Sequence, residues 1–276
     1  MVKWPNGKKI AVMLTFDVDA ETMWISRNPI SWKSPETLSR GAYAMNEAVP
    51  RTLDLLDKHN IKSSFFIPGW VIEKYPQRCK EIHEAGHEFG YHGYLHEFSP
   101  DITYEQENAL MEQCEAIIED ITGYRPVGHR SPMGEFLPHT VQLLVDRGYK
   151  YATAMKDWDV PYFHKLNGEE VNLVEIPTEW MLEDSPYYMF TLQEPVRRGI
   201  SPGSHVFEIW TSEFDGLYDE GKIMNLTFHP QMSGRVSRIK TLDEVLTYME
   251  RREGTWFARC DEVAQYLIDN KEALKG

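Results

Sequence analysis

The sequence is short of cysteine and of positive charge, and it lacks any long apolar run. Its three cysteines are far apart and odd in number, which is typical of reduced cytosolic thiols rather than of disulfides or a zinc–thiolate site. No apolar run approaches the roughly 18 residues of a membrane-spanning helix, so we expect no membrane span. The formal net charge of -14 argues against a nucleic-acid partner, because phosphate binding needs a basic surface.

The N-terminal residues carry no apolar signal core with a cleavage site before the first predicted strand. On this basis we expect a cytoplasmic protein. Apolar residues make up 42% of the chain and aromatic residues 12%, which argues against disorder and favours a packed interior. A length of 276 residues is near the upper limit for one hydrophobic core, so we predict a single domain over residues 1–276.

Strand-like and helix-like segments alternate along the chain, which predicts parallel strands with right-handed crossovers and an α/β barrel. The predicted strands are 9–14, 61–67, 87–92, 127–130, 149–154, 173–177, 223–228 and 255–257. The predicted helices are 37–60 (divided near 47–50), 70–85, 103–121, 138–147, 205–218, 242–250 and 261–274. We expect 24–35 to line or cover a site, 156–172 to be irregular, and the excursion 186–203 to expose an apolar patch over 187–190 that marks an interface.

Asp17 and Asp19 follow the first predicted strand. Residues two apart on an extended chain point the same way, so both carboxylates can face one point. Two anions this close repel each other unless a cation lies between them, and a metal ion is the simplest cation to propose. The alternative is a strand followed by an ordinary polar turn, which this stretch alone leaves open.

His92 and His96 lie four residues apart, directly after another predicted strand. On a helical turn, two imidazoles at this spacing share a face and can bind one metal ion. Imidazole and carboxylate ligands suit zinc, and also cobalt or nickel. One carboxylate with two histidines leaves coordination positions open, which is typical of a catalytic metal. The alternative is a surface or capping pair, but the aspartates at an equivalent strand end favour the metal.

Four more polar residues lie close to predicted strand ends. Glu88 and Glu97 flank the histidines, either to orient them or as exposed carboxylates, the commoner role of Glu. Arg130 is placed to pair with an aspartate, or else lies on the surface beside the turn at Pro132. His229 is well placed as a general acid, and equally as a buried core histidine. The spacing alone does not decide which aspartate binds metal and which acts as base on water.

Together these motifs resemble the NodB-homology polysaccharide deacetylases, carbohydrate esterase family 4. The matching stretches, in chain order, are Thr15-Phe16-Asp17-Val18-Asp19, His92-Gly93-Tyr94-Leu95-His96, Arg130-Ser131-Pro132-Met133-Gly134, Asp157-Trp158 and Leu226-Thr227-Phe228-His229-Pro230. The resemblance covers most of the chain. It implies a distorted single-domain (β/α)7-8 barrel with a divalent metal, most simply Zn²⁺, with Co²⁺, Ni²⁺ or Mn²⁺ as alternatives.

The resemblance also implies the division of labour in the metal site. The first aspartate of the family motif is the base and the second is a metal ligand, so Asp17 is expected to be the base. Asp19 is then expected to bind the metal together with His92 and His96. Arg130 is expected to orient the base.

The remaining motifs imply the acid and the walls of the pocket. His229 is expected to be the general acid, with Asp157 supporting it. Trp158 is expected to wall the pocket, and Pro132 and Met133 to line the substrate groove. Met133 departs from the family, because many deacetylases have an aromatic residue at this position.

Further stretches resemble the cytoplasmic-type members of the family, namely the Helicobacter-type peptidoglycan deacetylase-like proteins, the cyclic imide hydrolases and the allantoinase-like proteins. These stretches are 39–41, 86–88, 92–94 with 96–97, 173–177 with Trp180, and 229–230 with 234–235. Members of this subgroup tend to form tetramers with narrowed pockets, which implies a homo-oligomer, either a tetramer or a dimer. We expect Trp180 and Glu21 at the substrate site, where an inward-pointing Glu21 changes the charge around the metal.

The function implied by the resemblance is hydrolysis of a non-peptide carbon–nitrogen bond by metal-activated water. The substrate stays open between an acetylated amino sugar and a small cyclic imide or ureide, and the lack of an export signal favours the small molecule. A non-catalytic saccharide-binding protein of the same fold is a different class of function. The complete set of acid, base and metal ligands argues against it, and metal content discriminates the two.

Overall fold

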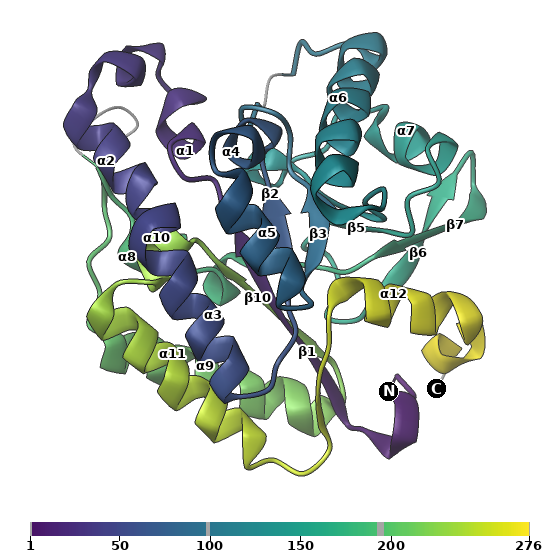
Figure 1. Cartoon of the computed structure of the whole chain (residues 1–276). Coiled ribbons are helices and arrows are strands. Elements are labelled where there is room, and N and C mark those ends of the chain that lie inside the picture. The colour runs from purple at the N-terminus through teal and green to yellow at the C-terminus, as the bar shows by residue number, and fades with distance from the viewer. Residues whose placement is uncertain (1, 98–99, 192–195, 276) are drawn as a thin grey trace.

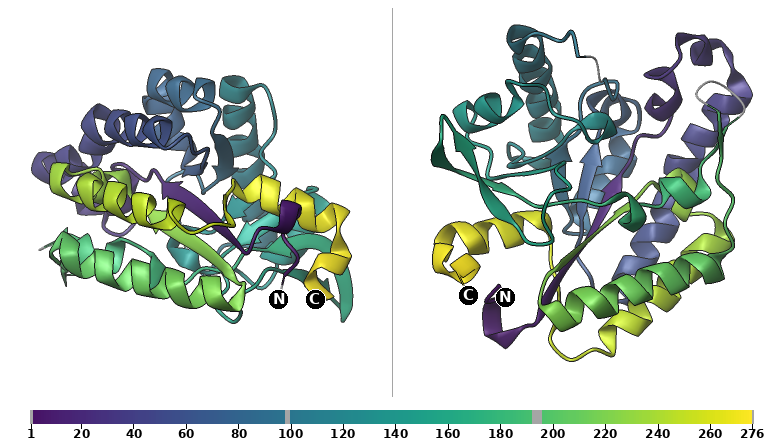
Figure 2. Two further views of the ribbon diagram at one scale, coloured as in Figure 1. Left: turned by 90° about the horizontal axis from the view of Figure 1, so that it is seen from below. Right: turned by 180° about the vertical axis from the view of Figure 1, so that it is seen from behind.

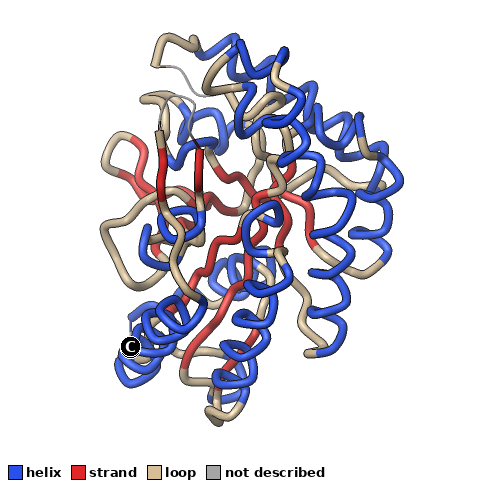
Figure 3. The backbone as a smooth tube through the Cα atoms, turned by 90° about the vertical axis from the view of Figure 1, so that its left-hand side faces the viewer, coloured by secondary structure: helices blue, strands red, loops and turns tan. Residues whose placement is uncertain are grey.

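A largely parallel sheet runs through the centre of the molecule, with helices packed around it (Figure 3). The computed structural model describes residues 2–97, 100–191 and 196–275 (Figure 1). Hydrogen-bonded neighbours follow the order β10-β1-β2-β3-β4-β5-β7-β6, and β11 also pairs with β1. The strands are β1 Ile10–Asp17, β2 Ser64–Ile67, β3 Glu88–Tyr91, β4 Gly128–Arg130, β5 Tyr151–Thr153, β6 Tyr162–Leu166, β7 Glu169–Glu175, β10 Ile223–Phe228 and β11 Thr255–Phe257.

Strand β1 is the axis of the sheet. All eight of its residues are buried, as expected for an apolar run covered on both faces. Phe16 stacks on Phe65 of β2, with ring centroids 4.9 Å apart, and lies 5.3 Å from the ring of Phe228 in β10. The strand extends beyond the predicted 9–14 and ends at Asp17, so packing of these rings fixes the position from which the polar motif begins.

The sheet has no strand ladder between β6 and β10 in the part of the chain that the structure describes. Side chains and one isolated bridge span this side instead. Asn225 of β10 donates to the carbonyl of Pro177, and Thr227 pairs with Glu183 in a parallel bridge. The prediction of an α/β barrel fold with parallel strands is confirmed, and these contacts account for its distorted closure.

The helices surround the sheet, and β1 and β10 are flanked by α3, α9 and α11 (Figure 1). The helices are α1 Thr22–Ile25, α2 Pro35–Tyr43, α3 Val49–Lys58, α4 Gly69–Lys74, α5 Pro76–Glu84, α6 Tyr104–Thr122, α7 Thr140–Asp146, α8 Ser185–Tyr188, α9 Gly203–Glu220, α10 Pro230–Ser233, α11 Val236–Glu250 and α12 Cys260–Asp269. Among the described residues, no helix is both long and apolar enough to cross a membrane.

Helix α6 shows how local sequence sets these boundaries. The Thr103 side chain accepts from the Gln106 amide, and the Gln106 side chain accepts from the Thr103 amide, so each satisfies a free donor at the helix start. Gly123 ends the helix in the left-handed region at φ 77°. The predicted start at 103 and end at 121 therefore lie within two residues of the structure.

Two predictions of local structure are wrong and one is confirmed. The segment 156–172 is not irregular, because β6 and β7 form an antiparallel hairpin. Its turn, Asn167-Gly168, has both residues at positive φ (52° and 85°), as the preferred two-residue hairpin turns require. The expected division of helix 37–60 near 47–50 is confirmed, because a π-helical stretch, Ala44–Ala48, separates α2 from α3. Helix 70–85 is broken at Pro76, which has no amide hydrogen to continue α4.

The excursion after β7 folds back on the barrel rather than exposing an apolar patch. It contains α8 and a two-stranded sheet of β8 Phe190–Thr191 with β9 Arg197–Arg198. Tyr188 and Met189 are buried in the main hydrophobic cluster, so the expected patch over 187–190 is wrong. The excursion covers one end of the barrel. The homo-oligomer that this patch was expected to support stays a prediction.

The two ends of the chain meet on the opposite side of the barrel (Figure 2). The amide of Lys3 donates to the carbonyl of Ala273 at 3.0 Å, and the Tyr266 hydroxyl donates to the carbonyl of Lys3. Trp4 is buried against Trp256 and Tyr266. These contacts tie α12 and the N-terminal residues to the start of the sheet, far along β1 from the polar motif.

Glu88, at the start of β3, is a buried carboxyl and not the exposed one that its residue type favours. Its oxygens accept from the hydroxyls of Ser64 and Tyr151 and from the amide of Asp261. Burial, reinforced by the Asp261 carboxylate, raises the pKa of Glu88 to about 8. This carboxyl therefore holds a proton in the folded protein at a pH where the unfolded chain has lost it.

We predict that Glu88→Gln removes a pH-dependent loss of stability. Between pH 4.5 and 8 the folded state binds more protons at Glu88 than the unfolded state, so its contribution to the free energy of unfolding falls as pH rises, by about 1.4 kcal/mol per pH unit at most. Denaturant unfolding of both proteins at pH 5 and pH 8 checks this. The free energy of unfolding of Glu88→Gln, relative to that of the wild type, should be higher at pH 8 than at pH 5. An equal difference between the two proteins at both pH values would contradict the prediction.

Candidate metal centre and active site

The polar motifs meet at the carboxyl ends of the strands. Asp17 ends β1, His92 follows β3, Arg130 ends β4 and His229 follows β10. These four strands run parallel in one sheet, so their carboxyl ends lie on the same side. All four side chains are buried, and all four line one cavity of about 600 Å³.

The chain leaves β1 in a conformation that turns Asp19 inward. The Val18 amide donates to the carbonyl of Phe66 and prolongs the extended backbone by one residue. Ala20 then takes a left-handed conformation at φ 47°, and helix α2 packs against this turn through Gly41. A Cβ on Gly41 would lie 2.5 Å from the Cα of Glu21, so only glycine permits this approach. As a result Asp19 is fully buried.

His92 and His96 lie on a loop, and the expected helical turn is wrong. Gly93 and His96 both have positive φ, 73° and 60°, which no helix accommodates. The Glu97 carboxylate holds the loop by accepting from the amides of Tyr94 and Leu95 at 2.9 and 2.8 Å. Glu97 is therefore the group that shapes the histidine loop, and not the free surface carboxylate that was the commoner expectation.

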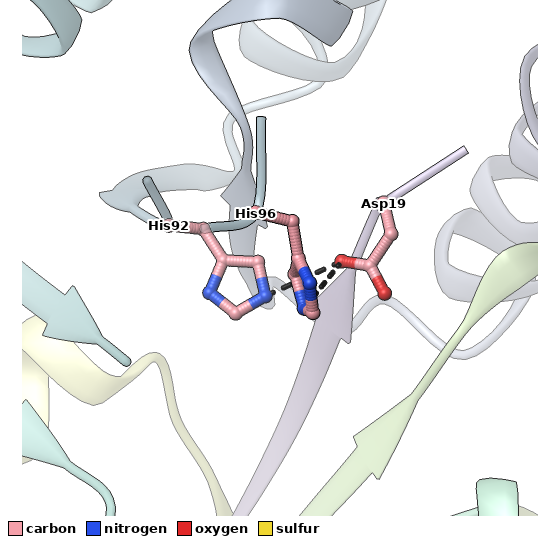
Figure 4. A group of neighbouring side chains, drawn as sticks. All are labelled: Asp19, His92 and His96. Atoms are coloured by element: carbon pink, nitrogen blue, oxygen red, sulfur yellow. Dashed lines mark ion pairs between the residues drawn. The ribbon is translucent and has the colours of Figure 1, made fainter. Parts of the chain in front are cut away.

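Asp19, His92 and His96 form the group that can hold a metal ion (Figure 4). One ligand atom from each lies within 4.8 Å of the others. The Nε2 atoms of His92 and His96 lie 3.3 and 3.8 Å from Asp19 Oδ1. His92 Nδ1 lies 2.9 Å from the carbonyl of Arg130, a contact that places the proton on Nδ1 and leaves Nε2 free to bind metal.

The donor set fits a divalent metal. Both Asp19 oxygens and His92 Nε2 are buried and have no hydrogen-bond partner in the described part of the chain. Such groups are costly to leave unpaired, and one cation between them would satisfy all three. Two imidazoles and one carboxylate are also a ligand set with open positions for water and substrate.

The charges within this group favour the ionic form of Asp19. Burial raises the pKa of Asp19, but the His96, His92 and His229 imidazoles outweigh burial and hold the pKa well below its usual range. Burial also lowers the pKa of His96 to about 3, against the pull of Asp19. Burial lowers the pKa of His92, but the nearby Asp17 and Asp19 carboxylates outweigh burial and raise this pKa above its usual value. An ionised carboxylate is the form in which Asp19 can bind a metal.

Asp17 lies beside the metal ligands and is paired with Arg130. The guanidinium Nη1 donates to Asp17 Oδ1 at 3.1 Å and to Thr227 Oγ1 at 2.7 Å, and Nη2 donates to Thr153 Oγ1. The same guanidinium lies over the Phe66 ring, 4.6 Å from its centroid. Four contacts therefore fix Arg130, which in turn orients the Asp17 carboxylate toward the cavity.

His229 is paired with Asp184. Its Nδ1 lies 2.7 Å from Asp184 Oδ1, and its amide donates to Oδ2 of the same carboxylate. Burial lowers the pKa of His229, but the Asp184 carboxylate more than offsets burial, and together with Asp19 and Glu183 raises the pKa to about 10. His229 Nε2 faces the metal ligands, 3.7 Å from Asp19 Oδ2. His229 thus carries a proton next to the place where a substrate would react.

The predicted support of His229 by Asp157 is wrong. Asp157 is exposed, does not line the cavity and accepts from the Tyr162 hydroxyl at 3.0 Å. Trp158 is 62% exposed and also lies outside the cavity lining, so it does not wall the pocket. Both residues lie on the segment between β5 and β6, where the hairpin carries the chain outward.

Three of the other predicted substrate residues lie close to the cavity. Met133 and Trp180 line it, and both side chains are partly exposed at its mouth. Pro132 is buried beneath, and it sets the turn in which Met133 has a φ of 62°. Glu21 does not face the cavity: its Oε1 accepts from Lys74 Nζ at 2.8 Å and from the Tyr75 hydroxyl at 2.7 Å. The expectation that Glu21 binds substrate is therefore wrong.

Known proteins resemble this chain in sequence and in fold. The family model for polysaccharide deacetylases matches residues 5–152, more than half of the chain. The chain belongs to the polysaccharide deacetylase family. A peptidoglycan deacetylase of Helicobacter pylori is 30% identical over 98% of this chain and 100% of its own length. The residues that the family model matches include the three members of the metal group and the Asp17–Arg130 pair.

Two solved structures resemble this deacetylase-family chain over nearly its whole length. A Mycobacterium smegmatis protein assigned to the polysaccharide deacetylases is 34% identical, with a TM-score of 0.93, over 98% of this chain and 94% of its own. The Puue allantoinase is 23% identical, with a TM-score of 0.84, over 97% and 93% of the two chains. The second likeness shows the fold alone.

Three residues of the site were not predicted from the sequence. Asp184 precedes the short helix α8 in an irregular stretch and carries no motif that points to His229. Thr227 of β10 and Thr153 of β5 hold the Arg130 guanidinium, but threonine in a strand is too common to stand out. Only the fold brings these side chains to the motif residues.

Proposed function

We propose that this chain is a metal-dependent hydrolase of non-peptide carbon–nitrogen bonds. The observation that supports it is the arrangement around one cavity. Asp17, paired with Arg130, lies 3.8 Å from His92 of the Asp19–His92–His96 group, and His229, paired with Asp184, lies 3.7 Å from Asp19 of the same group. Zn²⁺ is the metal we propose, with Co²⁺, Ni²⁺ and Mn²⁺ as alternatives, because imidazole and carboxylate ligands accept each of them.

Each side chain has one role in this proposal. A divalent metal bound by Asp19, His92 and His96 would lower the pKa of a water molecule and polarise the substrate carbonyl. Asp17, oriented by Arg130, takes the proton from the attacking water. His229 Nε2 gives a proton to the leaving nitrogen. Asp184, at hydrogen-bond distance from Nδ1, holds the ring in the orientation for this transfer and stabilises its protonated form beforehand. The water oxygen forms the new bond to the carbonyl carbon as the carbon–nitrogen bond breaks.

Two substrate classes share this chemistry. The family favours an N-acetylated amino sugar, because two relatives from Bacillus species are named as deacetylases of peptidoglycan N-acetylglucosamine and N-acetylmuramic acid. A cyclic imide or ureide is the second candidate, and the observation that favours it is the excursion after β7, because Pro186, Met189 and Val196 wall the cavity on one side. A walled cavity of about 600 Å³ suits a small molecule better than a long polymer.

The test compares two substrates on the metal-reconstituted protein. N-acetylglucosamine oligomers report deacetylation through release of acetate, and succinimide reports ring opening through loss of the imide. Turnover of either supports the proposed hydrolase and selects the substrate class. A protein that binds one metal ion per chain but hydrolyses neither contradicts the proposal for these two classes, and a protein without bound metal favours a saccharide-binding role.

Asp19→Asn should lose metal and turnover together. The substitution removes the one carboxylate in the ligand set and leaves neutral groups only, so we expect metal affinity to fall at least tenfold. Equilibrium dialysis against Zn²⁺ measures the affinity, and hydrolysis at saturating metal measures what remains. Glu21→Gln is the matched control, because Glu21 is also a buried carboxylate near this turn but pairs with Lys74. Equal loss of metal in both variants would contradict the assignment.

A further inference from the structure

Arg27, after helix α1, lines the cavity without a carboxylate partner among the described residues. Its Nη1 and Nη2 contact only the thioether sulfurs of Met189 and Met133, at 3.5 and 3.3 Å. Its Nε is buried and has no hydrogen-bond partner in this part of the chain. Thioether sulfur is a weak acceptor, so most of the donor capacity of this guanidinium is unused.

Two other cations that line the cavity have oxygen acceptors. Arg130 donates through Nη1 and Nη2 to Asp17 and to two threonine hydroxyls, although its Nε has no partner among the described residues. Lys156 donates to the carbonyls of Ala154 and Gly134 and lies over the Trp180 ring. Arg27 differs from both, because the described residues give its guanidinium two sulfur contacts and no oxygen acceptor.

A second arginine lies near the first. Arg197, on β9 of the excursion, also lines the cavity, and its charge lowers the pKa of Arg27 together with the larger effect of burial. Two like charges that face one cavity repel each other unless an anion lies between them. The described residues provide no such anion in contact with Arg27, so its guanidinium has no paired counter-ion there.

The carboxylates nearest to Arg27 serve other partners. Asp19 is a member of the metal group and lies below the cavity surface. Glu183 accepts from the Ser185 hydroxyl, and its Oε1 lies 3.9 Å from Nε2 of His229. Both carboxylates act on Arg27 only through space, because neither forms an ion pair with it in the structure.

We infer that Arg27 binds a carboxylate of the substrate, and that Arg197 adds to the positive charge at that end. The inference rests on the proposed function and narrows its substrate to an amide, imide or ureide that carries an acidic group. The preceding residue, Ser26, has its hydroxyl 3.4 Å from Nδ1 of the metal-group residue His96. Arg27 also lines the same cavity as His92 and His96, so one bound substrate can reach both Arg27 and the metal group.

The test uses two pairs of probes that differ by one carboxylate. N-acetylmuramic acid differs from N-acetylglucosamine by a lactyl carboxylate, and dihydroorotate differs from dihydrouracil by a ring carboxylate. Calorimetric titration of the metal-loaded wild type should show at least one acid binding about 10- to 100-fold tighter than its neutral partner, as expected for a charge-assisted hydrogen bond. The pair in which the acid binds more tightly than its neutral partner shows whether the carboxylate belongs to an amino sugar or to a cyclic ureide.

Arg27→Gln should abolish this preference for the acid. The affinity for the neutral partner should stay within about twofold of the wild-type value, because only the acid interacts with the charge of Arg27. Arg27→Lys should retain part of the preference. Arg252→Gln is the matched control: it removes the same charge from an exposed arginine that pairs with Asp215 outside the cavity. In the wild type the preference should also weaken as salt is raised, a readout that needs no variant.

The outcomes separate this inference from the proposed function. Equal binding of acid and neutral partner in both pairs, no binding of either acid, or equal weakening of both partners by Arg27→Gln overturns the role of Arg27. Hydrolysis of the probes is measured separately. Turnover without acid preference keeps the proposed hydrolase and overturns Arg27, whereas acid preference without turnover of any probe keeps Arg27 and contradicts the hydrolase.

Discussion

Asp17→Asn should lower kcat/KM by about 10³- to 10⁴-fold while the protein keeps its full complement of metal. The substitution is nearly isosteric, and it removes the only carboxylate that both contacts Arg130 and borders the metal group among the described residues. An amide cannot take a proton from water, so the contribution of a positioned general base, typically about 10² to 10⁴, is lost. The measurement is kcat/KM on whichever probe the wild type hydrolyses, together with metal content per chain.

The control for this prediction separates chemistry from folding. In Asp17→Asn the new amide would still accept from Arg130 through its carbonyl oxygen, so the melting temperature should change by only a few degrees. Asp17→Asn and Asp19→Asn should therefore differ in metal content, although both lose turnover. An Asp17→Asn protein with turnover within tenfold of the wild type would remove Asp17 as the base.

Asp184→Asn should lower kcat/KM by about 10²- to 10³-fold and shift the high-pH limb of the rate profile to lower pH. The Asp184 carboxylate raises the pKa of His229, so its loss lowers the pH at which this acid gives up its proton. Activity that needs protonated His229 is then lost earlier as pH rises. The measurement is the pH dependence of kcat/KM for the variant and the wild type.

Asp157→Asn is the matched comparison for Asp184→Asn. Asp157 is exposed and contacts only Tyr162 among the pairs described here, so its substitution should leave kcat/KM within about threefold. Asp184 also accepts from the Ser233 hydroxyl, so thermal unfolding must show that Asp184→Asn remains folded at the assay temperature. A larger loss in Asp157→Asn than in Asp184→Asn would reverse the assignment that the structure makes.

The fold was predictable because strand-like and helix-like segments alternate regularly along the chain. Apolar runs bounded by turns indicate buried parallel strands, and β1, β10 and β11 agree with their predicted ranges to within three residues. Predictions were weakest where the chain departs from this alternation of strands and helices. The Asn167-Gly168 turn signals a hairpin, but the exposed and buried residues of β6 and β7 do not alternate clearly enough to indicate strands.

The site was predictable only in part, for a physical reason. Asp17, Asp19, His92, His96, Arg130 and His229 are brought to one cavity as their positions at strand ends suggest. Asp184 and Arg27 could not be inferred in this way, because their roles depend on how the excursion after β7 and the segment after β1 fold over the barrel. Asp157 was misplaced because a short sequence match does not specify the direction in which a loop turns.

The proposed metal centre can be tested by titrating metal-free protein with Zn²⁺ and measuring metal binding and turnover in the same samples. One ion should bind per chain, and hydrolysis of N-acetylglucosamine oligomers or succinimide should rise in proportion until one equivalent is reached. Asp19→Asn should show neither the binding nor the rise. Full hydrolysis in the metal-free protein, or one bound ion that survives in Asp19→Asn, would contradict the metal centre on which the proposed function depends.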